Sequence, residues 1–131
     1  MTDSLEELRL RLAEFAAVRD WDQFHSPKNL AMALIAESAE IIEHFQWLNQ
    51  ADSSNLSPEK QQAVSYELAD VLIYLIRLAD KLDIDLITAA QAKIQINETR
   101  YPVERVKGNA RRAEEYSPYE TSSKNATHSN S

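Results

Sequence analysis

Two pairs of acidic residues stand three positions apart in otherwise apolar stretches of the sequence. The pairs are Glu37 with Glu40, and Glu67 with Asp70. Residues three apart share a face of an α-helix, so each pair would present two neighbouring carboxylates. Four carboxylates that converge in a partly dry site repel one another strongly unless a cation offsets their charge. Hard divalent ions bind through oxygen ligands, and Mg²⁺ keeps open positions for water and phosphate.

Other metal chemistries fit the sequence less well. A di-iron carboxylate bundle uses Glu-x-x-His motifs from two helices. Here Glu40 and His44 are four positions apart, and the segment around Glu67 and Asp70 contains no His. Zinc sites favour His and Cys, and the chain has three His and no Cys. A single acid-x-x-acid pair is usually a solvated helix face, so only the doubled pair indicates a metal site.

The sequence predicts four long helices, which must position these carboxylates. Strong helix formers dominate the composition, and one Gly and four Pro argue against a turn-rich β fold. Hydrophobic periodicity places the helices at about 4–19, 27–48, 57–82 and 86–97. Ser26 and Ser57 are suitable N-caps, each followed by Pro at the first helical position. The predicted fold class is all-α, with a four-helix protomer that oligomerises as a helical bundle.

The acid pairs lie at the margins of two apolar stripes. On a wheel at about 100° per residue, Glu37 and Glu67 flank the stripes of the second and third predicted helices. The stripe of the second helix comprises Leu30, Leu34, Ile41, Phe45 and Leu48. The stripe of the third helix comprises Val64, Leu68, Val71, Leu75, Leu78 and Leu82. Leu72 and Ile94 are also predicted core residues, and both acid pairs face one cleft if the two helices pack antiparallel.

Composition narrows the partners and the location. The chain has 131 residues, which suits one domain, predicted at 1–116. Residues 117–131 are rich in Ser, Thr and Asn and predict a flexible tail. The net charge of −7 gives no general attraction to a nucleic acid polymer. No stretch approaches the ~20 apolar residues of a membrane span, and with no Cys and no secretory segment we expect a cytoplasmic location.

Several blocks of sequence, in a fixed order, resemble a known family. They are WDQFHSPKNL from Trp21 to Leu30, ESAEIIEHFQW from Glu37 to Trp47, ELADVLIYL from Glu67 to Leu75, and Lys93, Asn97 and Arg100-Tyr101-Pro102. Together they resemble the MazG-like nucleotide pyrophosphohydrolases of the all-α NTP pyrophosphatase superfamily. The resemblance is closest to the dCTP pyrophosphatase branch and covers roughly residues 5–116.

The resemblance implies an activity and a cofactor. It implies Glu37, Glu40, Glu67 and Asp70 as ligands of Mg²⁺, with Mn²⁺ able to substitute, so that these residues act in catalysis through metal and water. The implied reaction converts a (d)NTP, with dCTP or a modified dNTP as candidates, to the monophosphate and pyrophosphate. The implied assembly is a homodimer or a homotetramer. The alternative, a non-catalytic helical module that binds a nucleotide or a protein, stays open, although such a module would not need the doubled acid pair.

A basic face of the fourth predicted helix is a candidate phosphate site. Lys93, Asn97 and Arg100 follow i, i+4, i+7 spacing, and share a face if the helix persists through Arg100. They could hold triphosphate oxygens, or form a solvated basic face near a helix C-terminus. The family resemblance favours the first role and adds Tyr101.

Two further groups are candidate substrate-binding residues. The aromatic group is Trp21, Trp47 and Tyr74. These residues could stack on a base or serve as core or interface aromatics. The group at the start of the second helix is His25, Lys28 and Asn29. Free N–H groups at a helix N-terminus favour phosphate or carbonyl recognition, whereas His25 could equally cap the helix or pack against it.

Overall fold

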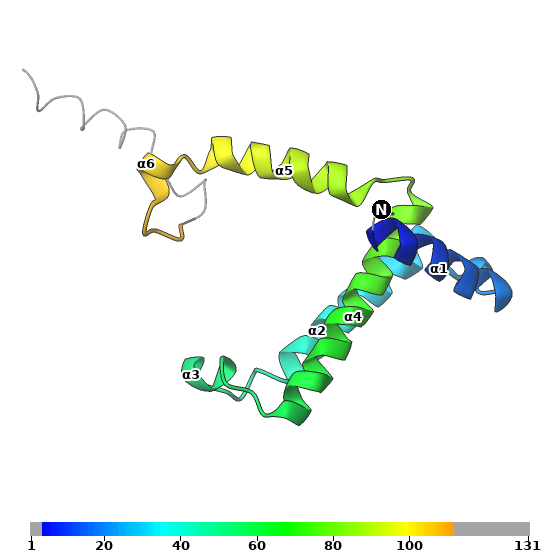
Figure 1. Ribbon diagram of the computed structural model, residues 1–131, viewed down its shortest axis with the longest axis horizontal. Coiled ribbons are helices and arrows are strands. Elements are labelled where there is room, and N and C mark those ends of the chain that lie inside the picture. Colours follow the sequence, from blue (N-terminus) through cyan, green and yellow to red (C-terminus); the bar gives the residue numbers. More distant parts are fainter. Residues whose placement is uncertain (1–3, 112–131) are drawn as a thin grey trace, which may run out of the picture. The chain divides into compact units, whose positions relative to one another are not determined.

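The computed structural model describes residues 4–111, and every regular element among them is helical (Figure 1). The four long helices are α1 (Ser4–Val18), α2 (Pro27–Glu43), α4 (Pro58–Lys81) and α5 (Leu86–Arg100). Three short elements join or follow them: η1 (Asp22–Phe24), α3 (Gln50–Ser53) and α6 (Val103–Val106). The all-α prediction is therefore confirmed. The tail predicted at 117–131 lies outside the described residues.

Side-chain caps set where two of the long helices begin. The Ser26 hydroxyl accepts a hydrogen bond from the Asn29 backbone N–H at 3.1 Å, and the Ser57 hydroxyl accepts one from Lys60 N–H at 3.2 Å. Both predicted starts are thus confirmed. The predicted end of the second helix is wrong, because α2 stops at Glu43. Bonds of the i→i−3 type tighten the turn that follows it.

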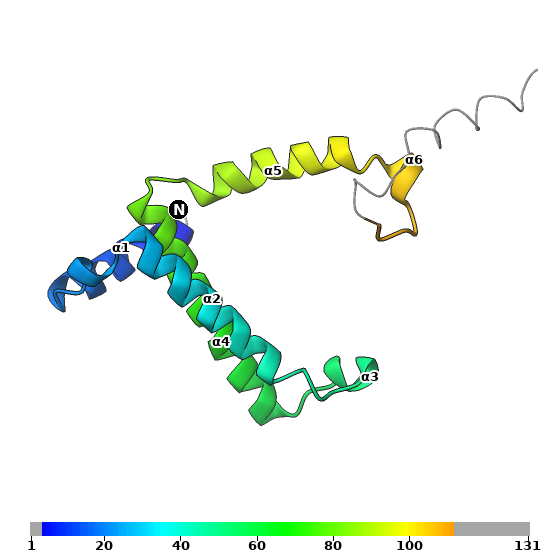
Figure 2. The same cartoon turned by 180° about the vertical axis from the view of Figure 1, so that it is seen from behind.

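The chain divides into two units, Met1–Leu86 and Ile87–Ser131. In the first unit, α2 packs along α4, and α1 also packs against α4. Helices α2 and α4 run antiparallel side by side (Figures 1 and 2), as the convergence of the two acid pairs required. No helix among residues 4–111 is long and apolar enough to cross a membrane.

The core formed by residues 4–111 is small. Its buried apolar residues are Ala16, Leu30, Val64, Ile76 and Ala79. Several predicted core positions are wrong, because their side chains are exposed. These are Leu68, Leu72, Leu75, Leu82 and Ile94. Within residues 4–111 the main neighbours of helix α4 are α2 and α1, and these two helices leave part of its apolar surface uncovered.

Candidate functional site

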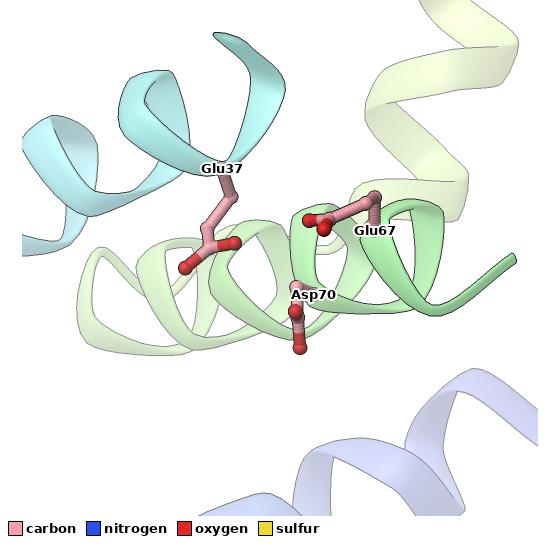
Figure 3. Close-up of side chains that lie close together, drawn as sticks. All are labelled: Glu37, Glu67 and Asp70. Carbon is pink, nitrogen blue, oxygen red and sulfur yellow. The ribbon is translucent and has the colours of Figure 1, made fainter. Parts of the chain in front are cut away.

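Three carboxylates from α2 and α4 converge in the first unit. Glu37 projects from α2, while Glu67 and Asp70 project from α4, one turn apart (Figure 3). One oxygen of each lies within 4.8 Å of the others, and all three residues are half-buried. The antiparallel pairing of α2 and α4 brings these residues together, since they are far apart in the sequence.

The close approach disfavours the ionised forms of two of these groups. Partial burial, followed by the charges of Glu40 and Asp70, raises the pKa of Glu37. Hydrogen bonding to the Glu40 carboxyl, partial burial and the charges of Glu40 and Asp70 raise the pKa of Glu67. Without a bound cation, the repulsion among these carboxylates is therefore not offset.

Glu40 and His44 lie beside the three converging carboxylates. Glu40 is exposed and stands outside the three-residue group, but its carboxylate acts on both Glu37 and Glu67. His44 places Nε2 3.8 Å from Glu67 Oε1. The structure thus brings together three of the four predicted ligands, with the fourth next to them.

The donor set suits a hard divalent cation. Oxygen is the ligand atom of Glu37, Glu67 and Asp70 alike, as Mg²⁺ and Mn²⁺ prefer. Moreover, Glu67 Oε2 is buried without a hydrogen-bond partner among residues 4–111. A buried carboxylate oxygen without a partner is costly, and a cation between the three side chains would satisfy it.

The group predicted at the start of the second helix lies around the first turn of α2. Lys28 and Asn29 are exposed, and His25 is half-buried. The side-chain amide of Asn29 donates to the Phe24 carbonyl oxygen at 3.0 Å. Asn29 therefore stabilises the segment before α2 through this hydrogen bond, a role that the sequence did not predict.

The predicted aromatic residues differ in their surroundings. Trp21 is 44% exposed. Its ring meets those of Phe15 and His25 edge-on, with centroids 5.7 Å and 6.4 Å apart. Trp47 lies in the turn after α2 and is 87% exposed, whereas Tyr74 is half-buried on α4. The exposed rings of Trp21 and Trp47 leave aromatic surface available to a ligand.

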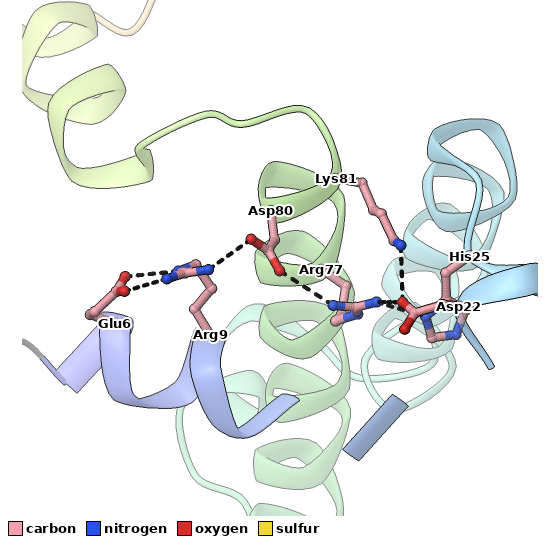
Figure 4. Close-up of polar contacts among 7 residues, drawn as sticks. All are labelled: Glu6, Arg9, Asp22, His25, Arg77, Asp80 and Lys81. Atoms are coloured by element: carbon pink, nitrogen blue, oxygen red, sulfur yellow. Dashed lines mark hydrogen bonds and ion pairs between the residues drawn. The ribbon is translucent and has the colours of Figure 1, made fainter. Parts of the chain in front are cut away.

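A polar network that the sequence analysis did not foresee centres on Arg77 (Figure 4). Arg77 Nη2 donates to Asp22 Oδ1 at 2.9 Å, and Nη1 donates to Asp80 Oδ2 at 3.4 Å. Lys81 Nζ also donates to Asp22 Oδ1 at 2.9 Å. These contacts with Lys81 and Arg77 lower the pKa of Asp22, which favours the carboxylate. Arg9 of α1 joins the network through Asp80 at 2.9 Å.

The spacing along α4 contained a signal for this network. Asp70, Tyr74, Arg77 and Lys81 recur at i, i+4, i+7 and i+11, which places them on one helix face. Val71, Leu75 and Leu78 of the apolar stripe stand between these positions in the sequence. Arg77 and Lys81, the two cations of this row, both donate to Asp22, which precedes α2.

The remaining predicted residues belong to the second unit. Helix α5 persists through Arg100, so Lys93, Asn97 and Arg100 do share a face. The Arg100 guanidinium lies 5.7 Å from the centroid of the Tyr101 ring, and Tyr101 N–H donates to the Asn97 carbonyl at 2.8 Å. Their binding of phosphate stays a prediction.

Comparison with known proteins gives consistent matches. A model of the MazG-like family matches residues 33–115. The chain is 45% identical over 109 residues to dCTP pyrophosphatase 1 of Rattus norvegicus, covering 82% of this chain and 64% of that protein. It is 43% identical over 111 residues to dCTP pyrophosphatase 1 of Homo sapiens, covering 83% of this chain and 65% of that protein. The chain therefore spans just under two thirds of the length of these relatives.

A solved structure also matches. The crystal structure of a pyrophosphatase from Archaeoglobus fulgidus DSM 4304 superposes with a TM-score of 0.71 at 41% sequence identity. The match covers 78% of this chain and 95% of that one.

Proposed function

The chain belongs to the MazG-like family, and from this premise we propose that it is a nucleoside triphosphate pyrophosphohydrolase dependent on a divalent metal ion. The proposed reaction is hydrolysis of a (d)NTP to the monophosphate and pyrophosphate. Relatives named dCTP pyrophosphatase 1 favour dCTP, or a modified dNTP, as the substrate.

One observation carries this proposal. Carboxylate oxygens of Glu37, Glu67 and Asp70 lie within 4.8 Å of one another, in a chain whose matched relatives are pyrophosphatases. A helical adaptor would gain nothing from such an arrangement, because close like charges destabilise the fold unless a cation offsets them.

Each acidic residue has a proposed role at this site. Glu37, Glu67 and Asp70 hold the divalent ion, proposed as Mg²⁺ with Mn²⁺ as a substitute, and Glu40 completes the ligand set. A bound divalent ion offsets charge on phosphate oxygens as the bond to pyrophosphate breaks. The four carboxylates in turn fix the point where the triphosphate and the attacking water meet.

The substrate-binding residues divide by chemistry. We propose that Lys93, Asn97 and Arg100 contact phosphate oxygens, since an ammonium, an amide and a guanidinium all donate hydrogen bonds. Tyr101 supports Arg100 through the ring contact described above. We propose that a second group of residues, near the two ends of α2 and on α4, contacts the nucleoside. They are Trp21, His25, Lys28, Asn29, Trp47 and Tyr74.

The proposal is tested with the 131-residue chain and a panel of triphosphates. Each canonical NTP and dNTP, with several modified dNTPs, is incubated with Mg²⁺, and pyrophosphate and monophosphate are both quantified. We expect equal amounts of the two products from at least one nucleotide, with no release in EDTA. Inorganic phosphate with a nucleoside diphosphate as products, or no turnover of any nucleotide, would overturn the assignment.

Two variants distinguish the site from the rest of the surface. Glu40→Gln removes a proposed ligand and should lower kcat roughly 10²–10³-fold, the typical loss when transition-state charge loses a stabilising group. Glu14→Gln neutralises an exposed acid on α1 and should leave turnover unchanged. If nucleotide binds the wild type without turnover, the non-catalytic module is favoured.

We also propose that the protein forms a homodimer or homotetramer. Ile35 and Ile42 on α2, and Leu72 and Leu75 on α4, are exposed in the single chain. Burying such surface against another copy is favourable at about 25 cal/mol per Å². Light scattering coupled to size exclusion should give two or four times the 14.9 kDa chain mass, and the mass of one chain would contradict the proposal.

A further inference from the structure

Arg77 is a buried cation that the proposed chemistry does not use. Its exposed fraction is 4%, although it lies on the same face of α4 as Asp70. Burying a charge is costly unless it is paired and hydrogen-bonded. Asp22 and Asp80 supply the counter-charges. The same guanidinium also reaches His25, with Nη2 3.3 Å from the ring Nδ1 (Figure 4).

This contact determines where the imidazole carries its proton. A guanidinium has only N–H donors and no acceptor. Nδ1 of His25 must therefore be the acceptor, so the proton of the neutral ring is on Nε2. We propose that Arg77 is a positioning residue that holds His25 as the Nε2–H tautomer, so that the ring donates a hydrogen bond to the nucleoside part of the substrate.

The charges around His25 keep the ring neutral. Partial burial and the positive charges of Arg77 and Lys81 lower the pKa of His25, and the negative charge of Asp22 opposes them without reversing the direction. A neutral ring with its proton on Nε2 offers one donor and, with Nδ1 occupied by Arg77, no free acceptor. It therefore suits a neutral acceptor, such as a base carbonyl oxygen or an unprotonated ring nitrogen.

The position along α4 favours the nucleoside over the phosphates. Arg77 follows Asp70 by seven residues, which is about 10 Å along the helix axis. His25 thus lies near one end of the helix pair, whereas the carboxylates proposed to hold the triphosphate lie near its middle. Trp21, whose ring meets His25 edge-on, offers an aromatic face beside it. This part of the inference rests on the proposed function, whereas the tautomer does not.

The tautomer is measured directly on the 131-residue chain without substrate. Long-range ¹H–¹⁵N correlation spectra of protein with ¹⁵N-labelled His distinguish a protonated from an unprotonated ring nitrogen, and His25→Gln assigns the signal. We expect an unprotonated Nδ1 and a protonated Nε2 for wild-type His25 at neutral pH. A protonated Nδ1 would overturn the proposal, and this arm needs no variant of Arg77.

A variant pair tests whether Arg77 causes the preference. Arg77→Met removes the donor while keeping a long side chain, and should give a mixture of tautomers. Lys81→Met removes the neighbouring cation, which contacts Asp22 rather than His25, and should keep Nδ1 unprotonated. An unchanged spectrum in Arg77→Met, with the fold verified by circular dichroism, would refute the role of Arg77.

Kinetics test the second half of the proposal. Arg77→Met should raise KM for the nucleotide roughly two- to tenfold with kcat nearly unchanged, as expected for one weakened hydrogen bond. His25→Gln should abolish most of this sensitivity in the double variant, because Arg77 acts through His25. Additive effects would show that Arg77 acts elsewhere. If no nucleotide is hydrolysed, the proposed function fails while the spectra still decide the tautomer.

Discussion

Replacing Asp70 by Asn should stabilise the metal-free protein while removing its response to magnesium. The two effects have one cause, the repulsion among carboxylates that converge between α2 and α4. If the carboxylates repel one another in the absence of a bound cation, removing one negative charge should stabilise the fold while impairing the function of the site. The substitution is nearly isosteric, so it removes charge with little change in packing.

The magnitude follows from the distance between the charges. Oxygens of Glu37 and Asp70 lie within 4.8 Å of each other. Two unit charges at this separation repel by about 0.9 kcal/mol in bulk water and by about 3.5 kcal/mol at an effective dielectric constant of about 20. Both side chains are half-buried, so we expect a gain of about 1–3 kcal/mol in the free energy of unfolding.

Thermal unfolding in EDTA and in Mg²⁺, at one protein concentration, measures both effects. A gain of 1 kcal/mol raises Tm by roughly 4 °C for a chain of 131 residues, where the ranges for smaller and larger domains meet. For the wild type, an ion at 100 times its Kd adds about 2.7 kcal/mol, so Tm should rise markedly with Mg²⁺. Asp70→Asn should begin higher in EDTA and rise little.

The control for the thermal unfolding experiment is a charge change outside the proposed site. Glu14→Gln removes an exposed acid far from the site in sequence, and should leave both Tm in EDTA and the magnesium response as in the wild type. If Asp70→Asn unfolds at a lower temperature in EDTA and retains the full response to Mg²⁺, the three carboxylates do not form a shared cation site.

Two further predictions concern pH and packing. In EDTA, Glu37 and Glu67, whose pKa values are raised, should stabilise the fold below the ordinary value of 4.5 and lose that contribution as pH rises through the raised pKa. Because His25, whose pKa is lowered, acts in the opposite sense, urea unfolding is compared between the wild type and Glu37→Gln. The free energy of unfolding of the wild type minus that of the variant should fall as pH rises, and a difference that rises steadily would contradict the prediction. Leu30→Ala, at a residue that is 1% exposed, should cost about 2–5 kcal/mol, whereas Met32→Ala, at a residue of the same helix that is 61% exposed, should change the free energy of unfolding by under about 0.5 kcal/mol.

Local signals in the sequence were enough to predict the helix starts and the acid pairs. A Ser followed by Pro specifies a helix start through groups that are neighbours in the chain, so Ser26 and Ser57 were identified correctly. The pairing of Glu37 with Glu67 and Asp70 followed from helical periodicity once two helices were assumed to pack antiparallel. Periodicity does not fix rotamers, which is why the position of Glu40 outside the converging group was not foreseen.

Nonlocal contacts explain what the sequence did not reveal. Leu68 and Leu82 belong to an apolar stripe, yet both are exposed, because a stripe shows which face is apolar and not whether one chain can cover it. Arg77 presents the opposite case, a charged residue that is buried. Its burial depends on Asp22, which precedes it by 55 positions, and no window of local sequence contains that pair.

The same antiparallel register of α2 and α4 accounts for both polar clusters. Glu37 in the body of α2 meets Asp70 of α4, whereas His25, just before α2 begins, meets Arg77, further along α4. A contact nearer the N-terminus of α2 thus involves a residue nearer the C-terminus of α4, as antiparallel packing requires. Leu30 lies between the two contacts in sequence and is fully packed, so it helps to fix the register that both clusters need. One pair of helices thus holds a carboxylate cluster and, further along α4, a charge-paired network that ends on His25, at the two places where we propose that the phosphates and the nucleoside bind.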